Sequence, residues 1–334
     1  MNAFHSTLVA IGFIVLPLAV SAAPKALPAP YKSAIVLDAA SGNILFEDKA
    51  DTLGAPASVT KLMTFLIVHD QIAAGTLTLQ TPVAITREDA AVGGSQVWLA
   101  EGETFSVEDL LFALMIQSAN DAAHALARAT HGAKEVFVTK MNDRARALGM
   151  NHTTFRTPHG LPPTSRKLME GDVTTARDLA LLSRELLLHT DVLHFTSVKE
   201  RVFRPGQPAP KEVVMRNHNH LLARVRGVDG LKTGFTATAG YCLAATAERD
   251  RRRVIVVVMG GPDAKTRDIK VAELIETGFS LAPAASAFIS PSESPFVSPT
   301  RPSAPATKPT PTPAPAAPAR GDAAPSVRFV PPKS

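Results

Sequence analysis

Short β-rich segments lie at both ends of the central part of this chain, and helical patterns occupy the sequence between them. The early pair covers residues 33–38 and 43–48, and three consecutive strands are expected at 231–236, 241–247 and 253–259. We expect the three later strands to pair antiparallel. Strands on both sides of a run of helices predict an antiparallel sheet covered by helices, in the α+β class.

Five segments have the apolar spacing of helices, and they cover residues 58–69, 106–116, 121–130, 134–148 and 264–277. Ser106 and Asp109 resemble a capping box at the start of the second segment. Gly132, Gly149 and Gly278 follow the third, fourth and fifth segments. Because glycine readily adopts the left-handed conformation that ends helices, these three residues are predicted to be helix stops.

The two ends of the chain differ in composition from the middle. Residues 1–22 hold an apolar run and the small residues Val20-Ser21-Ala22, as a secretory signal peptide does, although no Lys or Arg precedes the run. From 283 to 334, Pro, Ala, Ser and Thr predominate, so this tail is expected to be disordered. We therefore predict an exported protein of the periplasm or cell envelope, with one folded domain at 23–282.

Composition argues against several kinds of partner and site. The formal net charge is +5, from 35 basic and 30 acidic residues spread along the chain, and the basic run 249–253 is typical of a solvated turn. We expect no nucleic-acid partner. Cys242 is the only cysteine, which excludes an intrachain disulfide and a cysteine metal cluster. Its place on a predicted strand indicates a buried structural thiol.

The first motif that carries chemistry is Ser58-Val59-Thr60-Lys61. Residues three apart share a helix face, so Lys61 is expected one turn from the Ser58 hydroxyl. A serine hydroxyl needs a base to remove its proton, and a lysine serves if burial or a nearby cation lowers its pKa. The same spacing is common on ordinary surface helices, so alone it is a weak signal.

The second motif is Ser118-Ala119-Asn120, between two predicted helices. Its hydroxyl could relay a proton and its amide could bind a substrate peptide group. Serine and asparagine are also ordinary helix caps, so this motif is weaker still when taken singly.

The third motif is Lys232-Thr233-Gly234, on a predicted strand. Lys232 offers a positive charge and Thr233 a hydroxyl for a carboxylate, and Gly234 leaves room for a substrate to lie against the strand. A strand that contains a lysine is usually only an exposed edge, so this motif too has a purely structural explanation.

The three motifs follow one another in this order, on the expected helix, loop and strand. Together they resemble the Ser-x-x-Lys, Ser-x-Asn and Lys-Thr-Gly set of penicillin-binding proteins and β-lactamases. Within that group, residues 31–282 closely resemble the serine-type D-Ala-D-Ala carboxypeptidases, the low-molecular-mass penicillin-binding proteins. The sequence segments that support this closer resemblance are Pro56-Ala57-Ser58-Val59-Thr60-Lys61-Leu62-Met63-Thr64, Pro158-His159-Gly160-Leu161, Ala239-Gly240-Tyr241 and Val258-Met259-Gly260-Gly261.

This resemblance implies a five-stranded antiparallel sheet with flanking helices beside an all-helical lobe, and it implies a role for each motif residue. Ser58 would be the acylated nucleophile, Lys61 its base, and Ser118 the relay of a proton to the leaving D-alanine. Asn120 would hold the substrate amide, Lys232 would tune the electric field, and Thr233 would bind the terminal carboxylate. The remaining assignments are Gly234 beside the substrate, the backbone N–H groups of Ser58 and Phe235 as the oxyanion hole, and Arg267 near the carboxylate.

The same resemblance leaves several points open. The substrates would be peptidoglycan stem peptides, with β-lactams as inhibitors, and we expect no metal or cofactor. Many relatives have a second β-rich domain and a membrane-anchoring helix after the catalytic domain. We expect neither here, and the tail in their place could contact the cell wall or a protein. A carboxypeptidase and a D,D-endopeptidase would use the same residues. His159 could be structural or catalytic.

Two other functions remain as alternatives. A class A β-lactamase would need a glutamate base on a loop, and residues 159–175 offer Glu170 and Asp172 without the usual Glu-x-x-x-Asn pattern. A non-catalytic wall-binding module is expected to have lost at least one motif, whereas all three are intact.

Overall fold

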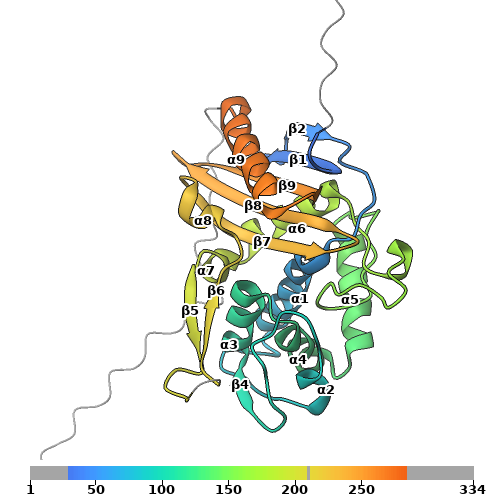
Figure 1. Cartoon of the computed structure of the whole chain (residues 1–334), viewed down its shortest axis with the longest axis vertical. Helices are drawn as coiled ribbons and strands as arrows, with labels where there is room; N and C mark the ends of the chain where they lie inside the picture. Colours follow the sequence, from blue (N-terminus) through green and yellow to red (C-terminus); the bar gives the residue numbers. More distant parts are fainter. Residues whose placement is uncertain (1–28, 209–210, 284–334) are drawn as a thin grey trace, which may run out of the picture. The chain divides into compact units, whose positions relative to one another are not determined.

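Five strands form one antiparallel sheet with the order β2-β1-β9-β8-β7, in a computed structural model that describes residues 29–208 and 211–283 (Figure 1). The strands are β1 (Ser33–Asp38), β2 (Ile44–Asp48), β7 (Val228–Thr236), β8 (Gly240–Arg249) and β9 (Arg252–Gly261). The prediction of a five-stranded antiparallel sheet in an α+β fold is confirmed. The predicted signal peptide, and the predicted tail except for Pro283, lie outside the described residues.

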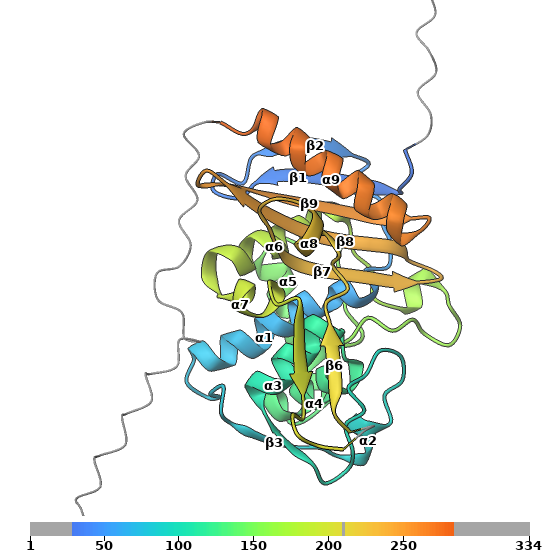
Figure 2. The same cartoon turned by 60° about the vertical axis from the view of Figure 1, so that its left-hand side comes forward.

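The sheet separates two hydrophobic clusters because successive side chains of a strand point to opposite faces. On β1, Ile35 and Leu37 belong to one cluster, whereas Ala34 and Val36 belong to the other. Helix α9 (Ala264–Leu281) covers the second face, and α6 (Ala176–His189) packs on the first (Figure 2).

A helical part lies against the first face of the sheet. Its central helix, α1 (Lys61–Ala73), is almost entirely buried and contacts helices on several sides as well as β7. The same part contains α2 (Arg87–Ala90), α3 (Val107–Phe112), the π-helix Ala113–Gln117, α4 (Asn120–His131), α5 (Lys134–Ala147) and α7 (Val192–Thr196). Helix α8 (Leu221–Arg224) instead belongs to the cluster on the second face, together with α9. Short 3₁₀ helices occupy Ala57–Thr60 and Leu168–Glu170.

Two short antiparallel ribbons in the helical part were not predicted. They are β3 (Pro82–Ala84) with β4 (Thr104–Ser106), and β5 (Glu200–Phe203) with β6 (Val213–Arg216). Among the described residues, no helix is both long enough and apolar enough to pass through a membrane.

The predicted helix stop at Gly278 is wrong. Helix α9 continues to Leu281, and a Cβ atom on Gly278 would lie 2.9 Å from Val36 Cγ1 and 3.2 Å from Val254 Cγ1. The glycine therefore lets the helix approach the sheet closely, which is a use of glycine that a one-dimensional pattern does not distinguish from a helix stop.

The basic run 249–253 is only partly a solvated turn. Asp250 and Arg251 form the turn between β8 and β9, but Arg253 is 3% exposed and pairs with Asp229 at 2.7 Å and Glu248 at 2.5 Å. A strand position between two carboxylates explains why this arginine is buried. Cys242 is buried as predicted, and burial raises the pKa of its thiol to about 11.

Candidate active site

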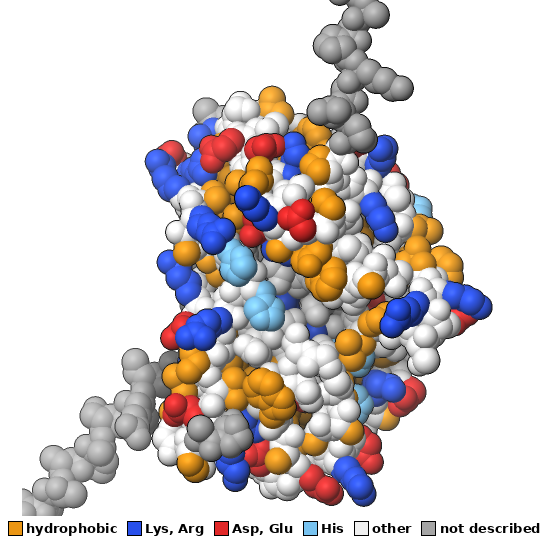
Figure 3. Space-filling view, in the orientation of Figure 1, with side chains coloured by type: hydrophobic (Ala, Val, Ile, Leu, Met, Phe, Trp, Pro, Cys, Tyr) orange, Lys and Arg blue, Asp and Glu red, His pale blue; other side chains and the backbone are white. Residues whose placement is uncertain are grey.

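The three motifs meet at a cavity of about 360 Å³ between the sheet and the helical part. Figure 3 shows this hollow on the face of the molecule, with histidine side chains at its edge. Its lining residues are Ser58, Ser95, Ser118, His218, His220, Thr233, Gly234, Phe235, Tyr241, Ala264 and Arg267. Six of the nine predicted site residues are among them, and the other three, Lys61, Asn120 and Lys232, are buried directly behind it.

Ser58 lies in a tight 3₁₀ turn, Ala57–Thr60, immediately before α1. The preceding residue, Ala57, has a φ of 49°, a left-handed value that is costly for a residue with a side chain. Two glycines press on this turn: a Cβ atom on Gly234 would lie 2.6 Å from the Pro56 carbonyl oxygen, and one on Gly160 would collide with the Ala57 carbonyl oxygen. Gly234 thus lets β7 approach the backbone of the Ser58 turn closely, in addition to leaving room beside the strand.

Lys61 is completely buried, and its ammonium nitrogen has three hydrogen-bond partners. Nζ lies 3.0 Å from Ser58 Oγ, 2.6 Å from Asn120 Oδ1 and 2.7 Å from the His159 carbonyl oxygen. Burial lowers the pKa of Lys61 well below its ordinary value, and the charge of Lys232 lowers it further. The geometry therefore joins a serine hydroxyl to an amine whose neutral form could accept the hydroxyl proton.

Ser118 and Asn120 occupy the junction between the π-helix and α4. Ser118 has a φ of 62°, and its buried Oγ has no hydrogen-bond partner among the described residues. Asn120 accepts from Lys61 and donates through Nδ2 to the Gly93 carbonyl oxygen at 2.8 Å. The Asn120 amide therefore holds the Lys61 side chain in place. The Ser118 hydroxyl lies at the cavity and is available to bond to a molecule that enters it.

On β7, Lys232 is buried and Thr233 faces the cavity. Burial and the nearby charge of Arg267 lower the pKa of Lys232 to about 7, and its Nζ donates to the Thr233 carbonyl oxygen at 3.1 Å. Arg267, from α9, also lines the cavity and is held by Asp268 Oδ1 through Nε at 2.9 Å and Nη2 at 2.6 Å. Lys232, Thr233 and Arg267 give this wall hydroxyl and cationic groups suited to a carboxylate.

Asp172, which the sequence analysis considered only for the β-lactamase alternative, holds neighbouring segments of the site together. Its Oδ2 accepts from the hydroxyls of Thr60 at 2.8 Å and Thr157 at 3.1 Å, and its Oδ1 accepts from the Arg156 N–H at 2.7 Å. It thereby ties the segment that supplies the His159 carbonyl oxygen to the start of α1. No short motif signals such contacts.

His159 acts through its backbone in this arrangement. Its ring is buried, its Nδ1 accepts from the Leu161 N–H at 3.2 Å, and burial lowers the pKa of the ring to about 3. The residue contributes to the site by its carbonyl oxygen, which accepts from Lys61 Nζ.

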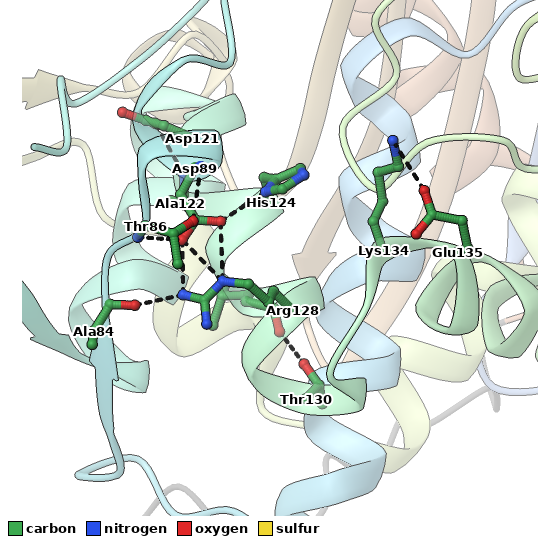
Figure 4. A network of polar contacts seen from close by, with 11 residues as sticks. Ala84, Thr86, Asp89, Asp121, Ala122, His124, Arg128, Thr130, Lys134 and Glu135 are labelled. Carbon is green, nitrogen blue, oxygen red and sulfur yellow. Dashed lines mark hydrogen bonds and ion pairs between the residues drawn. The ribbon is translucent and has the colours of Figure 1, made fainter. Parts of the chain in front are cut away.

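A network between α2 and α4 anchors the loop that carries Gly93 and Ser95 (Figure 4). The Asp89 carboxylate accepts hydrogen bonds from the Thr86 N–H at 2.9 Å and from Arg128 Nη2 at 2.8 Å. It also lies 2.7 Å from His124 Nδ1. Burial alone would raise the pKa of Asp89, but these hydrogen bonds lower it below its ordinary value. Farther along the loop, Asp121 accepts from the Val97 and Leu99 N–H groups.

Gly160→Ala is expected to destabilise the protein and slow its acylation. The residue has a φ of 85°, and the added methyl group would displace the Ala57 carbonyl oxygen beside Ser58. Gly75→Ala is the matched control, since Gly75 has a φ of 73° with nothing within 4 Å of the added Cβ atom. We expect about 1 kcal/mol of lost unfolding free energy for Gly75→Ala and about 3 kcal/mol for Gly160→Ala, measured by urea denaturation. Equal losses would mean that the Ala57 contact is unimportant.

The comparisons with known proteins agree with this geometry. The family model for D-alanyl-D-alanine carboxypeptidase matches residues 20–263. The chain belongs to this family. It is therefore a serine hydrolase of the D-alanyl-D-alanine carboxypeptidases, as the resemblance predicted.

Individual relatives support the same assignment. The chain is 35% identical to D-alanyl-D-alanine carboxypeptidase DacF of Bacillus subtilis, over 84% of this chain and 72% of the relative, and 37% identical to DacC of Escherichia coli, over 73% and 60%. Penicillin-binding protein D2 of Listeria monocytogenes, solved with ampicillin bound, has a TM-score of 0.66 at 35% identity and covers 76% of this chain and 99% of its own. The Francisella tularensis carboxypeptidase DacD has a TM-score of 0.69 at 30% identity, over 80% and 74%.

Proposed function

We propose that this protein removes the terminal D-alanine from peptidoglycan stem peptides through an acyl-enzyme on Ser58. The observation that carries this proposal is the completely buried Lys61 ammonium, 3.0 Å from Ser58 Oγ and with a lowered pKa. A neutral Lys61 takes the Ser58 proton as Oγ attacks the penultimate D-alanine carbonyl carbon. Membership of the carboxypeptidase family supports the choice of substrate.

Negative charge that develops on the attacked carbonyl oxygen needs donors already in place. The backbone N–H groups of Ser58 and Phe235 are the proposed donors, because Gly234 brings β7 against the nucleophile's turn. A donor of this kind typically contributes about 3 kcal/mol to transition-state stabilisation. Gly234 thus supports the oxyanion hole by allowing the two backbones to approach.

The leaving D-alanine needs a proton on its nitrogen and a partner for its carboxylate. Ser118 Oγ, buried and without a partner in the described structure, passes the proton from Lys61 to the leaving amine. Thr233 and Arg267 bind the carboxylate, and Lys232 supplies the positive field beside it. Asn120 holds Lys61 before substrate enters and then shares its amide with the substrate peptide group.

Water releases the second product by hydrolysing the ester, again with Lys61 as the base. Among the described residues that line the cavity there is no carboxylate. Glu170, the β-lactamase-like alternative, is exposed and pairs with Lys167 at 3.2 Å, and Asp172 is occupied by four hydrogen bonds. These positions favour a peptidase that β-lactams acylate and inhibit over a rapid β-lactamase.

The cellular setting follows from the substrate. Peptidoglycan is outside the cytoplasmic membrane, so the protein must be exported to the periplasm or cell envelope, in keeping with the leader at 1–22. The segment 283–334 then serves as a spacer that contacts the wall or a partner protein. Apart from Pro283, neither segment lies within the described residues.

Mass spectrometry of products tests the function directly. Incubation with a purified monomeric muropeptide that ends in D-alanyl-D-alanine is expected to remove one alanine, and penicillin added beforehand is expected to prevent this. A muropeptide of unchanged mass, with protein that is folded by circular dichroism, would contradict the proposal.

A further inference from the structure

Trp98 is the single tryptophan of the chain, and its side chain is 61% exposed. It lies on the loop 91–103 between α2 and β4, three residues after Ser95, which lines the catalytic cavity. The Asn120 N–H donates to the Ser95 carbonyl oxygen at 2.8 Å, so the loop is joined directly to the second motif. Because three residues span at most about 11 Å, the backbone of Trp98 is close to the mouth of the cavity.

The backbone on both sides of Trp98 is anchored to the fold. Val97 and Leu99 are buried in the core, and their N–H groups donate to Asp121 Oδ2 at 3.2 and 3.0 Å. Asp121 is itself completely buried, on the first turn of α4 (Figure 4). The side chain of Arg204, which is 6% exposed, donates to the carbonyl oxygens of Val97 at 2.8 Å and Trp98 at 2.9 Å. A fixed backbone therefore carries the exposed ring.

This anchoring holds Trp98 in a backbone conformation that is unfavourable for it. Its φ is 53°, in the left-handed region, where a residue with a bulky side chain is a rare outlier. Two of the other residues with left-handed φ, Ala57 and Ser118, adjoin or belong to the catalytic motifs. Such strain persists only where the surrounding structure imposes it, and it is concentrated at functional sites. The fold thus keeps the ring in water at a cost in stability, which indicates a ligand for the ring.

The surroundings of the ring favour a sugar as this ligand. On the loop 91–103, all of which the structure describes, Trp98 is the one exposed large hydrophobic side chain, and Ser95 and Glu101 are exposed polar residues. One ring among polar groups offers too little apolar area for a lipid surface or a partner helix. A pyranose ring has an apolar C–H face and a rim of hydroxyl groups. It can therefore stack on a single aromatic ring while polar groups bind its edge.

The proposed substrate brings a sugar within reach of the ring. In peptidoglycan the N-terminus of each stem peptide is joined to a sugar of the glycan strand. The carbonyl that Ser58 attacks belongs to the fourth residue of the stem peptide, and four extended residues span at most about 14 Å. This length is comparable with the distance between the cavity and Trp98, so the sugar end of a bound stem peptide can meet the loop.

We propose that Trp98 stacks on a sugar ring of the glycan strand, so that the protein prefers stem peptides that are still attached to their sugars. Trp98 does not touch the reacting bond, and Ser58 and Lys61 perform the same chemistry with or without it. Its contribution is to substrate binding and specificity. The inference rests on the proposed function and adds the sugar to its substrate class.

Two substrates that differ only in the sugar test this inference. The full chain and its Trp98→Ala variant are compared on a purified disaccharide pentapeptide and on the same pentapeptide with an N-acetyl group in place of the sugars. We expect the wild-type protein to have about tenfold higher kcat/KM on the disaccharide pentapeptide, mainly through a lower KM. Trp98→Ala should lose this preference and change by less than about twofold on the acetylated pentapeptide. Trp98→Tyr should keep most of the preference, because it retains an aromatic ring.

A matched control and a direct binding measurement accompany the kinetics. Met169→Ala is the control, since Met169 is also 61% exposed but does not line the catalytic cavity. Binding is measured in the Ser58→Ala variant, where tryptophan fluorescence reports on Trp98 alone because the chain has no other tryptophan. The disaccharide pentapeptide should shift the emission to shorter wavelengths, and the acetylated pentapeptide should leave it unchanged.

Several results would overturn the inference. These are equal kcat/KM of the wild-type protein on the two substrates, equal losses of Trp98→Ala on both, loss of the preference in Met169→Ala, or an emission shift that the acetylated pentapeptide reproduces. Failure of the wild-type protein to hydrolyse the acetylated pentapeptide or to react with penicillin would instead overturn the proposed function itself.

Discussion

Ser58→Ala is expected to abolish covalent labelling by a fluorescent penicillin and to lower release of D-alanine by about 10⁴-fold or more. The hydroxyl lies 3.0 Å from Lys61 Nζ, and no ester can form without it. The loss should appear in kcat, whereas substrate binding through Thr233 and Arg267 should persist.

The structural cost of this substitution is small. Ser58 is half-buried, and its Oγ forms a hydrogen bond with Lys61. The variant should therefore melt within a few degrees of the wild-type protein. Ser95→Ala is the matched control, since Ser95 also lines the cavity but does not contact Lys61. Undiminished labelling of Ser58→Ala, or an equal loss in Ser95→Ala, would show that the nucleophile is another residue.

The sequence identifies the residues that the structure brings together at the cavity because each motif is local. The spacing of Ser58 and Lys61 places both on one helical turn wherever the helix packs, and Lys232 to Gly234 need only a strand. The strands were equally predictable, since β1 and the last three strands have apolar runs bounded by turns. These features depend on neighbours within a few residues along the chain.

Contacts between distant segments could not be predicted in this way. Asp172 reaches Thr60 across 112 positions, and Asn120 reaches Gly93 across 27. The left-handed backbone of Ser118 has no sequence signal, because that conformation is rare outside glycine and is imposed by the surrounding fold. Gly278 is the opposite case. Its position in the sequence clearly predicted a helix stop, but in the fold it lies inside α9 and allows close packing on the sheet.

Lys61→Arg is expected to lower the rate of acylation by penicillin about 10³-fold. Arginine keeps its proton at any accessible pH, so it cannot accept the Ser58 proton. It would also keep a charge in a site where burial and Lys232 already disfavour one. In the wild-type protein, acylation should fall as pH is lowered and Lys61 becomes protonated. Because its pKa is lowered, this fall should lie below the range near about 10.4 where an exposed lysine titrates.

A second variant separates chemistry from folding. Lys61→Met nearly keeps the side-chain volume and removes the charge, but it leaves Asn120 Oδ1 and the His159 carbonyl oxygen without their donor, at a cost of about 1–3 kcal/mol each. Both variants are measured by stopped-flow acylation and by thermal melting, with Lys49→Arg, an exposed substitution, as the control. If either variant folds and is acylated at close to the wild-type rate, Lys61 is not the base. Because Lys61 Nζ is held at 2.6–3.0 Å by partners from three different segments, we expect neither variant to approach that rate.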